Sequence, residues 1–461
     1  GVLRPETRVA DLVPAFARDG FDAVTVEHLL THTSGIQSYT AVPEFRAGMR
    51  NDLTVDQLMA IFRDKPMEFE PGARFNYNNS GYALLGAIIE KASGLNYADF
   101  IRTRIFQPLG MRNSFYEVAQ TVVPGRVDGY DRMPDGSVRR AEWISMTQPY
   151  AAGSLISTVD DLLLWNRAIA EGRILKPETW RRAFAPYTMN DGLSSGYGYG
   201  WFIGSAAGRP SIEHGGDING FSTDELWIPS ERLFVVVLAN HRREPQRNPG
   251  DISQRIATAL LGEPAAPATA ALTPQQLDAY VGVYRVGETD TRVITRDGGT
   301  LYSQRGSNPR QALTPLGNDE FVYANTGTRA RFVRGADGAV TGMRMKQRIG
   351  PEELSPRTAQ TVEQVAAAAA TTVRVPVEVL DRYVGRYELT PEMTVTIRRQ
   401  GEALLAQPSG DDEVTLVPES QTRFTVPEED ITVVFQVDAS GAATGFVLHQ
   451  NGREMTVRKL P

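Results

Sequence analysis

Two segments in the C-terminal half of the chain repeat each other, and this repeat limits the possible folds more than any other feature. Residues 277–284 (LDAYVGVY) match residues 380–387 (LDRYVGRY), 103 positions further on. The same offset pairs Phe332 with Phe435. A unit that recurs at a fixed spacing is typical of a duplicated structural module. The sequence therefore predicts two copies of one small domain.

Each copy has the pattern of antiparallel β-structure. Short stretches that alternate apolar and polar residues, such as 291–294 and 394–397, end in turns rich in Gly and Asp. This spacing is typical of a small barrel or sandwich. Four tyrosines recur identically in the two copies, which favours a role in the barrel cores over a ligand site: Tyr280, Tyr284, Tyr383 and Tyr387.

Two linkers divide the chain into three parts. Residues 262–270 are rich in Pro and Ala, and residues 355–376 contain an alanine run between polar residues. We therefore expect a first domain at 1–262 and β-barrel repeats at 272–355 and 376–461.

The first domain mixes helical and strand patterns. Residues 83–91 place apolar side chains at i, i+1, i+4 and i+5, which predicts a helix that ends near Gly94. A second helix is expected after the cap at Thr158. Three strands are expected further on, at residues 211–214, 221–228 and 233–240. A helical region followed by an antiparallel meander indicates an α+β fold.

Composition excludes several classes of function. A net charge of -7 and a pI near 5.5 argue against binding nucleic acid through a broad basic surface. Without cysteine the chain can form no disulfide and no thiolate metal site, so cytoplasm and periplasm are both allowed. The longest apolar runs have strand length, so no membrane span is expected.

Two motifs carry candidate chemistry. Tyr77 and Asn79 set a phenol and a carboxamide two residues apart just before the predicted apolar helix. His214 precedes Gly215-Gly216-Asp217 on a predicted strand. Each motif has a structural alternative: the Asn78-Asn79 pair suits a turn and a helix N-cap, and His214 suits an ordinary strand histidine.

A metal site is a weaker candidate. His28 and His32 lie four residues apart beside Glu27, which suggests zinc. The order differs from His-Glu-x-x-His, however, and no third ligand is evident. We expect neither a metal nor an organic cofactor.

Five landmarks stand in an order that resembles the serine β-lactamase-like family, which includes class C β-lactamases, DD-peptidases, D-aminopeptidases and esterases. They are residues 26–36 (VEHLLTHTSGI), 75–82 (FNYNNSGY), 105–111 (IFQPLGM), 153–158 (GSLIST) and 214–216 (HGG). The two β repeats resemble the lipocalin-like barrels appended to D-aminopeptidase-type members. The resemblance implies a β-lactamase-like α+β domain, with an antiparallel sheet and a helical region, followed by two small antiparallel β-barrels.

The family's nucleophile motif, Ser-x-x-Lys, does not occur in these 461 residues. The chain has only five lysines, and none has a serine three positions before it: the residues there are Phe62, Ile88, Arg173, Met343 and Thr456. We therefore expect that an N-terminal segment carrying the motif is missing and that the chain as given is inactive. The alternatives are a true pseudoenzyme and a site completed by a second polypeptide.

The resemblance assigns roles to the remaining residues. Tyr77 would relay a proton beside the serine and lysine, and Asn79 would hold the substrate's acyl carbonyl. His214, Gly215 and Gly216 would take the place of Lys-Thr-Gly on a strand edge along which substrate lies, and the backbone N–H of Asp217 would be an oxyanion donor. A free phenol titrates near 10, so Tyr77 needs a neighbouring cation to act as a base.

These roles predict acyl transfer through a serine ester on a small acyl or peptide substrate. Histidine at position 214 is mostly neutral, which favours a peptidase or esterase over a dedicated β-lactamase. The alternative is a noncatalytic binding protein that retains the fold. The resemblance slightly favours a periplasmic or secreted location, and the oligomeric state stays open.

Overall fold

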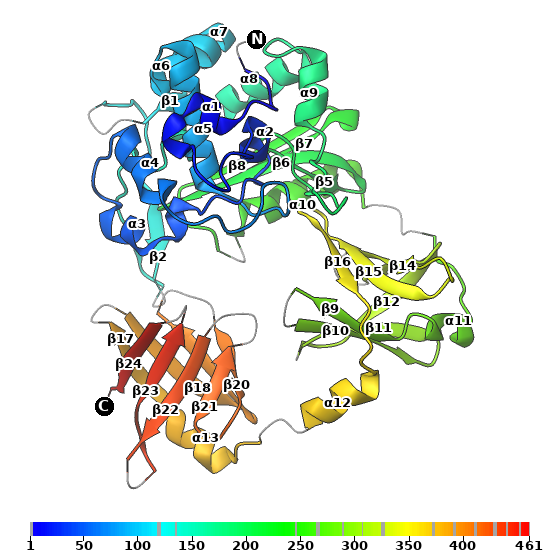
Figure 1. Cartoon of the computed structure of the whole chain (residues 1–461). Helices are drawn as coiled ribbons and strands as arrows, with labels where there is room; N and C mark the ends of the chain where they lie inside the picture. The colour runs from blue at the N-terminus through cyan, green and yellow to red at the C-terminus, as the bar shows by residue number, and fades with distance from the viewer. Residues whose placement is uncertain are drawn as a thin grey trace.

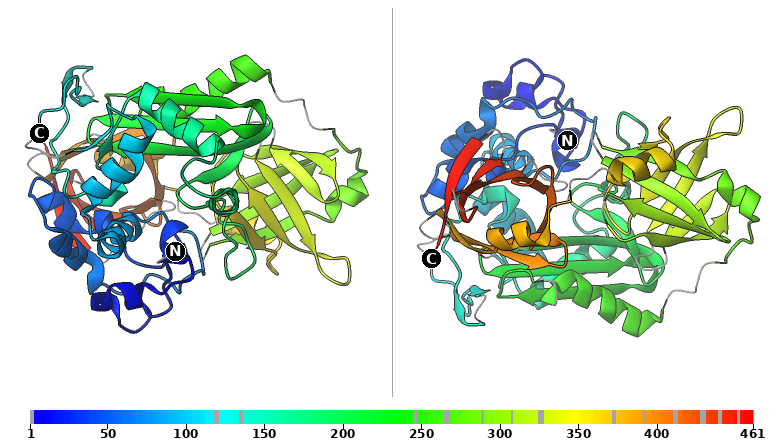
Figure 2. Two further views of the ribbon diagram at one scale, coloured as in Figure 1. Left: turned by 90° about the horizontal axis from the view of Figure 1, so that it is seen from above. Right: turned by 90° about the horizontal axis from the view of Figure 1, so that it is seen from below.

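The computed structural model describes residues 3–117, 121–133, 136–244, 247–263, 268–287, 290–306, 308–323, 328–370, 374–390, 393–409, 413–426, 431–438, 441–450 and 453–460. Helices and a four-stranded sheet form the upper part in Figure 1, and two β-barrels lie below it, joined to each other by a helical linker. The views in Figure 2 place the second barrel under the helical half and the first barrel to its side.

The four-stranded sheet is antiparallel and follows chain order: β5 (Phe202–Ala206), β6 (Arg209–Ile218), β7 (Phe221–Ile228) and β8 (Leu233–Ala239). Helix α10 (Pro249–Leu261) covers one face, where Ala257 packs against Leu226 and Val235. The three predicted strands are present. The prediction for β6 was too short, because Gly215 and Gly216 continue the strand by pairing with Asp224 and Thr223 of β7.

The helical region is built around α5, whose buried face includes Ala83, Leu84 and Ile88. This helix ends where Gly94 adopts a left-handed conformation, as the sequence predicts, and the Thr158 side chain caps α8. The elements of this region are α1 (Val9–Leu12), α2 (Val26–Leu30), α3 (Pro43–Gly48), α4 (Val55–Arg63), α5 (Asn79–Ser93), α6 (Tyr97–Ile101), α7 (Gln107–Leu109), α8 (Val159–Ala170), α9 (Pro177–Ala183) and the strand pairs β1 (Phe115–Tyr116) with β4 (Leu155–Ile156) and β2 (Tyr130–Arg132) with β3 (Val138–Arg140).

Both repeats are eight-stranded antiparallel barrels, each preceded by a short helix. The second barrel closes through pairing of its first and last strands, and the first is nearly closed, through an isolated bridge between Tyr284 and Arg357. The first comprises α11 (Pro274–Asp278), β9 (Gly282–Val286), β10 (Asp290–Asp297), β11 (Thr300–Arg305), β12 (Gln311–Gly317), β13 (Glu320–Tyr323), β14 (Arg329–Arg334), β15 (Val340–Lys346) and β16 (Glu352–Pro356). The second comprises α13 (Val377–Tyr383), β17 (Gly385–Thr390), β18 (Met393–Gln400), β19 (Ala403–Pro408), β20 (Val414–Pro418), β21 (Arg423–Val426), β22 (Ile431–Val437), β23 (Ala443–Gln450) and β24 (Arg453–Lys459).

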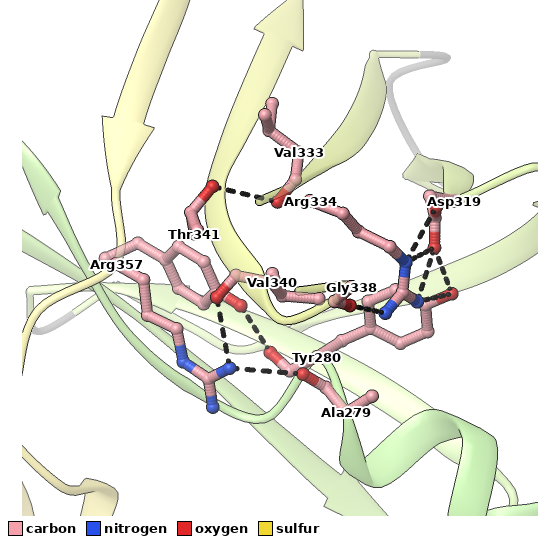
Figure 3. A network of polar contacts seen from close by, with 10 residues as sticks. Ala279, Tyr280, Asp319, Val333, Arg334, Gly338, Val340, Thr341 and Arg357 are labelled. Atoms are coloured by element: carbon pink, nitrogen blue, oxygen red, sulfur yellow. Dashed lines mark hydrogen bonds and ion pairs between the residues drawn. The ribbon is translucent and has the colours of Figure 1, made fainter. Parts of the chain in front are cut away.

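The repeated tyrosines lie in the barrel cores, as predicted. The Tyr284 hydroxyl donates to the Tyr280 carbonyl at 2.7 Å, and Tyr387 makes the same bond to Tyr383. In the first barrel the Tyr280 hydroxyl also donates to Asp319, which pairs with Arg334 (Figure 3). Each of the four rings is therefore buried in its barrel core with its hydroxyl hydrogen-bonded.

The linker between the barrels contains a helix. Residues of the alanine run belong to helix α12 (Val362–Ala370), which lies between the two barrels in Figure 1. Alanine has the highest helix propensity of the common residues, so a run of five forms a helix instead of an extended linker.

The hairpin between β15 and β16 docks on the first domain. The backbone N–H of Glu352 donates to the Ser194 carbonyl at 2.8 Å, and Arg348 donates to both carboxylate oxygens of Glu213 at 2.7 and 2.8 Å. At the point of contact Gly196 lies against the Gly350 carbonyl. The first barrel is therefore fixed to the edge of the sheet by a specific polar interface.

We predict that Gly196→Ala weakens this interface by about 2 kcal/mol more than Gly192→Ala, since overpacking costs about 1–3 kcal/mol. Both glycines have positive φ, +63° and +79°, so both variants carry a backbone penalty. A Cβ at Gly196 would overlap the Gly350 carbonyl, whereas nothing lies within 4 Å of one at Gly192. Hydrogen exchange at the Glu352 amide should accelerate about 30-fold in Gly196→Ala alone; equal rates in the two variants would contradict the docking.

Candidate active site

The start of α5 separates the two asparagines of the Tyr-x-Asn motif. Asn78 is the N-cap: its Oδ1 accepts from the Gly81 N–H at 2.9 Å, and its Nδ2 donates to the Ile36 carbonyl. Asn79 is the first helical residue, and its Nδ2 donates to Thr40 Oγ1 at 3.3 Å. Because the capping role falls to Asn78, the carboxamide of Asn79 is left to line a cavity.

Tyr77 lies over a buried aromatic cluster. Its ring centroid is 4.2 Å from that of His32, 6.0 Å from His214 and 6.5 Å from Tyr197. The side chain is 44% exposed, since it opens into the cavity. Partial burial raises the pKa of Tyr77 above its usual value near 10, so the phenol is protonated at neutral pH. Tyr77 can therefore donate a proton here but is not set up as a base.

His214 is held as a neutral ring. Its Nδ1 lies 2.7 Å from the Gly215 carbonyl, which can only accept, and its Nε2 lies 2.9 Å from the Tyr197 hydroxyl. Nδ1 therefore carries the proton and Nε2 accepts from Tyr197. Burial lowers the pKa of His214, the Gly215 carbonyl raises it and Arg243 lowers it further, with a net downward shift. The ring supplies no cation at neutral pH.

The strand edge that follows His214 is open among the described residues. β5 pairs with β6 only as far as Glu213, while β7 pairs with β6 up to Ile218. Gly215, Gly216 and Asp217 thus have a strand partner on one side only. An unpaired strand edge can hydrogen-bond an extended ligand backbone. The Asp217 side chain forms an ion pair with Arg243, with 3.6 Å between Asp217 Oδ2 and Arg243 Nε.

One cavity of about 1960 Å³ joins these groups. It is lined by all six residues that the sequence analysis selected, namely Tyr77, Asn79, His214, Gly215, Gly216 and Asp217. The cavity is about twice the largest volume usual for a small-molecule site, so it has room for more than one small substrate.

Two residues outside the predicted motifs also shape the site. Tyr197 fixes His214, and the signal for it was the glycine-aromatic run at residues 196–200. Glu225 lies directly opposite His214 on β7 and lines the cavity, and burial raises its pKa to about 8. A carboxyl group that is half protonated near pH 8 can act as an acid or base at neutral pH.

His28 and His32 are engaged in separate contacts. The Thr25 N–H donates to His28 Nδ1 at 3.2 Å within a capping box, and the Asn78 N–H donates to His32 Nδ1 at 3.0 Å. The part of the chain that the structure describes holds no group of three His, Cys, Asp or Glu side chains arranged to bind a metal ion. Nor does any described helix combine the length and apolar character needed to cross a membrane.

Comparison with known proteins matches both parts of the chain. The family model described as Beta-lactamase matches residues 1–260, and one described as a domain of unknown function (DUF3471) matches residues 266–361 and 369–459. Penicillin-binding protein 4* of Bacillus subtilis is 27% identical over 383 residues, covering 78% of this chain and 83% of that protein.

Two further relatives extend this picture. A D-aminopeptidase of Gluconobacter oxydans is 30% identical over 264 residues, covering 57% of this chain and 49% of that protein, so the chain spans about half the length of this relative. Among solved structures, the octameric penicillin-binding protein homologue from Pyrococcus abyssi is 27% identical, with a TM-score of 0.50, and the match covers 77% of this chain and 83% of that one.

Proposed function

Because the chain belongs to the Beta-lactamase family, we propose that its first domain, residues 1–262, is the substrate-binding part of a serine hydrolase that acts on small amides or esters. The observation that carries the proposal is the shared cavity. Tyr77, just before α5, and Asn79, its first residue, line it together with the open edge of β6. The barrels at 272–355 and 376–461 are proposed as separate domains.

In this proposal the substrate lies along β6 with its acyl group between the sheet and α5. Backbone groups of Gly215 and Gly216 pair with the extended substrate, and glycine lets it approach closely. The carboxamide of Asn79 and the backbone N–H of Asp217 donate to the acyl oxygen. Hydrogen bonds aimed at that oxygen would stabilise the charge that develops on it in the transition state.

Tyr77 would transfer a proton between the nucleophile and the leaving group. This role needs a cation that lowers the pKa of the phenol, and within the described residues the pKa is raised. The serine and the lysine that family members carry as Ser-x-x-Lys are not among these 461 residues. We therefore place the nucleophile outside them, and we expect these residues alone to bind substrates without hydrolysing them.

The substrate class follows from His214 and from the relatives. A neutral imidazole offers no fixed charge for the carboxylate of a β-lactam, so we propose D-amino-acid amides or esters as substrates. The D-aminopeptidase of Gluconobacter oxydans is named for a related activity. A noncatalytic binding protein is the second candidate, and the absence of Ser-x-x-Lys favours it.

We predict that the chain as given binds D-alanine amide in saturation-transfer NMR, with no turnover and no covalent labelling by a fluorophosphonate or a fluorescent penicillin. Asn79→Ala should weaken binding about fivefold, since a lost hydrogen bond costs about 1 kcal/mol. Asn76→Ala is the matched control, because Asn76 is exposed and bonds Glu68 outside the cavity. Covalent labelling would place a nucleophile within these residues, and equal affinities in the two variants would exclude the assigned cavity.

The sequence encoded upstream of Gly1 separates the two candidates. A Ser-x-x-Lys there, with hydrolysis of D-amino-acid amides by the extended chain, supports the enzyme. An unrelated segment supports the binding protein. Rapid penicillin turnover by the extended chain, with no amide or ester hydrolysis, would contradict the proposed substrate class.

A further inference from the structure

The interior of the first barrel contains a buried arginine. Arg292, on β10, is 8% exposed, and its Nη1 donates to Ser303 Oγ at 3.2 Å and to the Tyr323 hydroxyl at 3.0 Å. Its Nε is fully buried and has no hydrogen-bond partner among the described residues. No described carboxylate forms an ion pair with this guanidinium, whereas its neighbour in the ladder, Arg305, pairs with Asp290 at 2.7 Å.

The second barrel shows that the fold does not need this polar group. At the offset of the repeat, the positions of Arg292, Ser303 and Tyr323 are occupied by Val395, Ala406 and Val426. The equivalence holds in the strand pairing: Leu301 pairs with Leu313 in the first barrel as Leu404 pairs with Leu416 in the second. All three replacements are buried and apolar in the core of the second barrel.

A buried charge without a counter-ion is costly, typically by several kcal/mol, and replacing such groups with apolar ones is often neutral or stabilising. The second barrel carries apolar residues at the same positions. The need to fold therefore does not explain the buried arginine in the first barrel. An anionic ligand would supply the missing charge.

The geometry of the guanidinium indicates the kind of anion. Among the described residues its hydrogen bonds come from Nη1, so the edge formed by Nε and Nη2 is free of them. Two parallel donors on one guanidinium edge match the two oxygens of a carboxylate. The Tyr323 hydroxyl also contacts Ser303 Oγ at 2.8 Å and the sulfur of Met345 at 3.9 Å, so the arginine is held in a fixed position beside an apolar side chain.

The cluster lies at the end of the barrel that faces the first domain. Arg292 is near the start of β10, Tyr323 ends β13, and Met345 is one residue from the end of β15. Because neighbouring strands are antiparallel, these positions share one end with the hairpin of β15 and β16. Tyr280, Asp319 and Arg334 form a polar network at the opposite end (Figure 3).

We propose that the first barrel binds the carboxylate of a small organic molecule at this end, with Arg292 as the anion-binding residue and Ser303 and Tyr323 holding its guanidinium in place. Among the described residues of the second barrel, the three equivalent positions are apolar. This inference does not depend on the hydrolase assignment.

The test is a titration of the full chain with sodium butyrate at constant ionic strength, followed by ¹³C-methyl NMR of the methionines. The Met345 methyl signal should shift saturably with butyrate and at least tenfold less readily with butyramide, which lacks the charge. Because Met345 lies in the barrel, its signal separates this site from the cavity of the first domain. Chloride competing as strongly as butyrate, or an unmoved Met345 signal, would overturn the proposal.

The matched variant is Arg292→Val with Ser303→Ala and Tyr323→Val, which installs the residues of the second barrel. It should lose the butyrate response and melt no lower than the original chain, since a buried charge is removed. Arg292→Lys and Tyr323→Phe test the same point with smaller changes; the lysine should bind at least tenfold more weakly because it lacks the two-donor edge. An unchanged Met345 response in Arg292→Lys and in the triple variant would assign the arginine a purely structural role.

Discussion

Replacing Arg348 with alanine is expected to lower the free energy of unfolding of the first domain by about 2 kcal/mol, less than the cost of breaking a fully buried ion pair, because the Arg348 side chain is 37% exposed. The Glu213 side chain is 4% exposed, and Arg348 reaches it from the first barrel. Ser211 Oγ also donates to Glu213 at 2.8 Å, which is too little to compensate a buried carboxylate alone. Denaturant unfolding followed by tryptophan fluorescence would measure the loss, since all five tryptophans lie in the first domain.

Arg344→Ala is the matched control, because Arg344 lies four residues earlier in the chain, on β15, with an exposed side chain. It should change stability by less than about 0.5 kcal/mol, as is usual for surface positions. The double variant Glu213→Leu with Arg348→Met should recover most of the loss, since it leaves no unpaired charge. If Arg348→Ala costs no more than Arg344→Ala, the ion pair does not hold the barrel to the sheet.

Much of the fold could be predicted because its signals are local or repeated. The strands β7 and β8 follow from short apolar patterns bounded by turns, and the helix α5 from its apolar spacing and the glycine that ends it. The barrels follow from the offset of 103 residues, which recurs in the hydroxyl bonds of Tyr284 and Tyr387. The helix α12 over the alanine run was not among the predictions, although the helix propensity of alanine favours it.

The interface between the first barrel and the sheet could not be predicted from local patterns. Arg348 and Glu213 are separated by 135 positions, and nothing around either residue marks it as a partner. The same holds for His214 and Tyr197, which meet because two strands and a glycine-rich loop converge. The environment of Tyr77 also depends on tertiary packing, so the direction of its pKa shift could not be read from the motif.

In the candidate site too, local motifs predict which residues are present, whereas tertiary packing decides their surroundings. Its six residues were selected from two motifs 137 positions apart, and the structure brings them around one cavity. Their chemical roles stay predictions, because the motif specifies residue types but not the charges beside them. Glu225 illustrates the limit: its carboxyl group enters the cavity only because β7 pairs with β6 in one register.

The buried ring of His32 is expected to make the first domain less stable in acid. Burial is the main cause that lowers the pKa of His32 to about 3, and repulsion from His214, once that ring is protonated in acid, acts in the same direction. The Asn78 N–H donates to Nδ1, which a protonated ring could not accept. In the unfolded chain the imidazole titrates near 6.5. Below that pH the unfolded state therefore binds a proton that the folded state does not bind. The contribution of His32 to the free energy of unfolding is therefore fully present above pH 6.5 and is lost as the pH decreases toward 3.

This contribution should amount to about 2 kcal/mol between pH 7 and pH 5, because each unit of pKa difference corresponds to about 1.4 kcal/mol. His32→Asn isolates it: asparagine tolerates the left-handed backbone at this position, where φ is 56°, and its side-chain oxygen can accept from the Asn78 N–H. The variant should be less stable at pH 7, since it loses the ring contacts with Tyr77 and Tyr82.

The informative quantity is the stability difference between the original chain and His32→Asn at each pH. The raised pKa values of Glu225 and Asp224 act in the opposite sense, because those carboxyl groups take up protons in the folded state as the pH falls. They are present in both proteins and cancel in the difference. Denaturant midpoints measured from pH 7 to pH 5 should show the two proteins converging by about 2 kcal/mol. A constant difference would mean that His32 is protonated inside the folded domain, and the cluster beneath Tyr77 would then carry the cation that its proposed role requires.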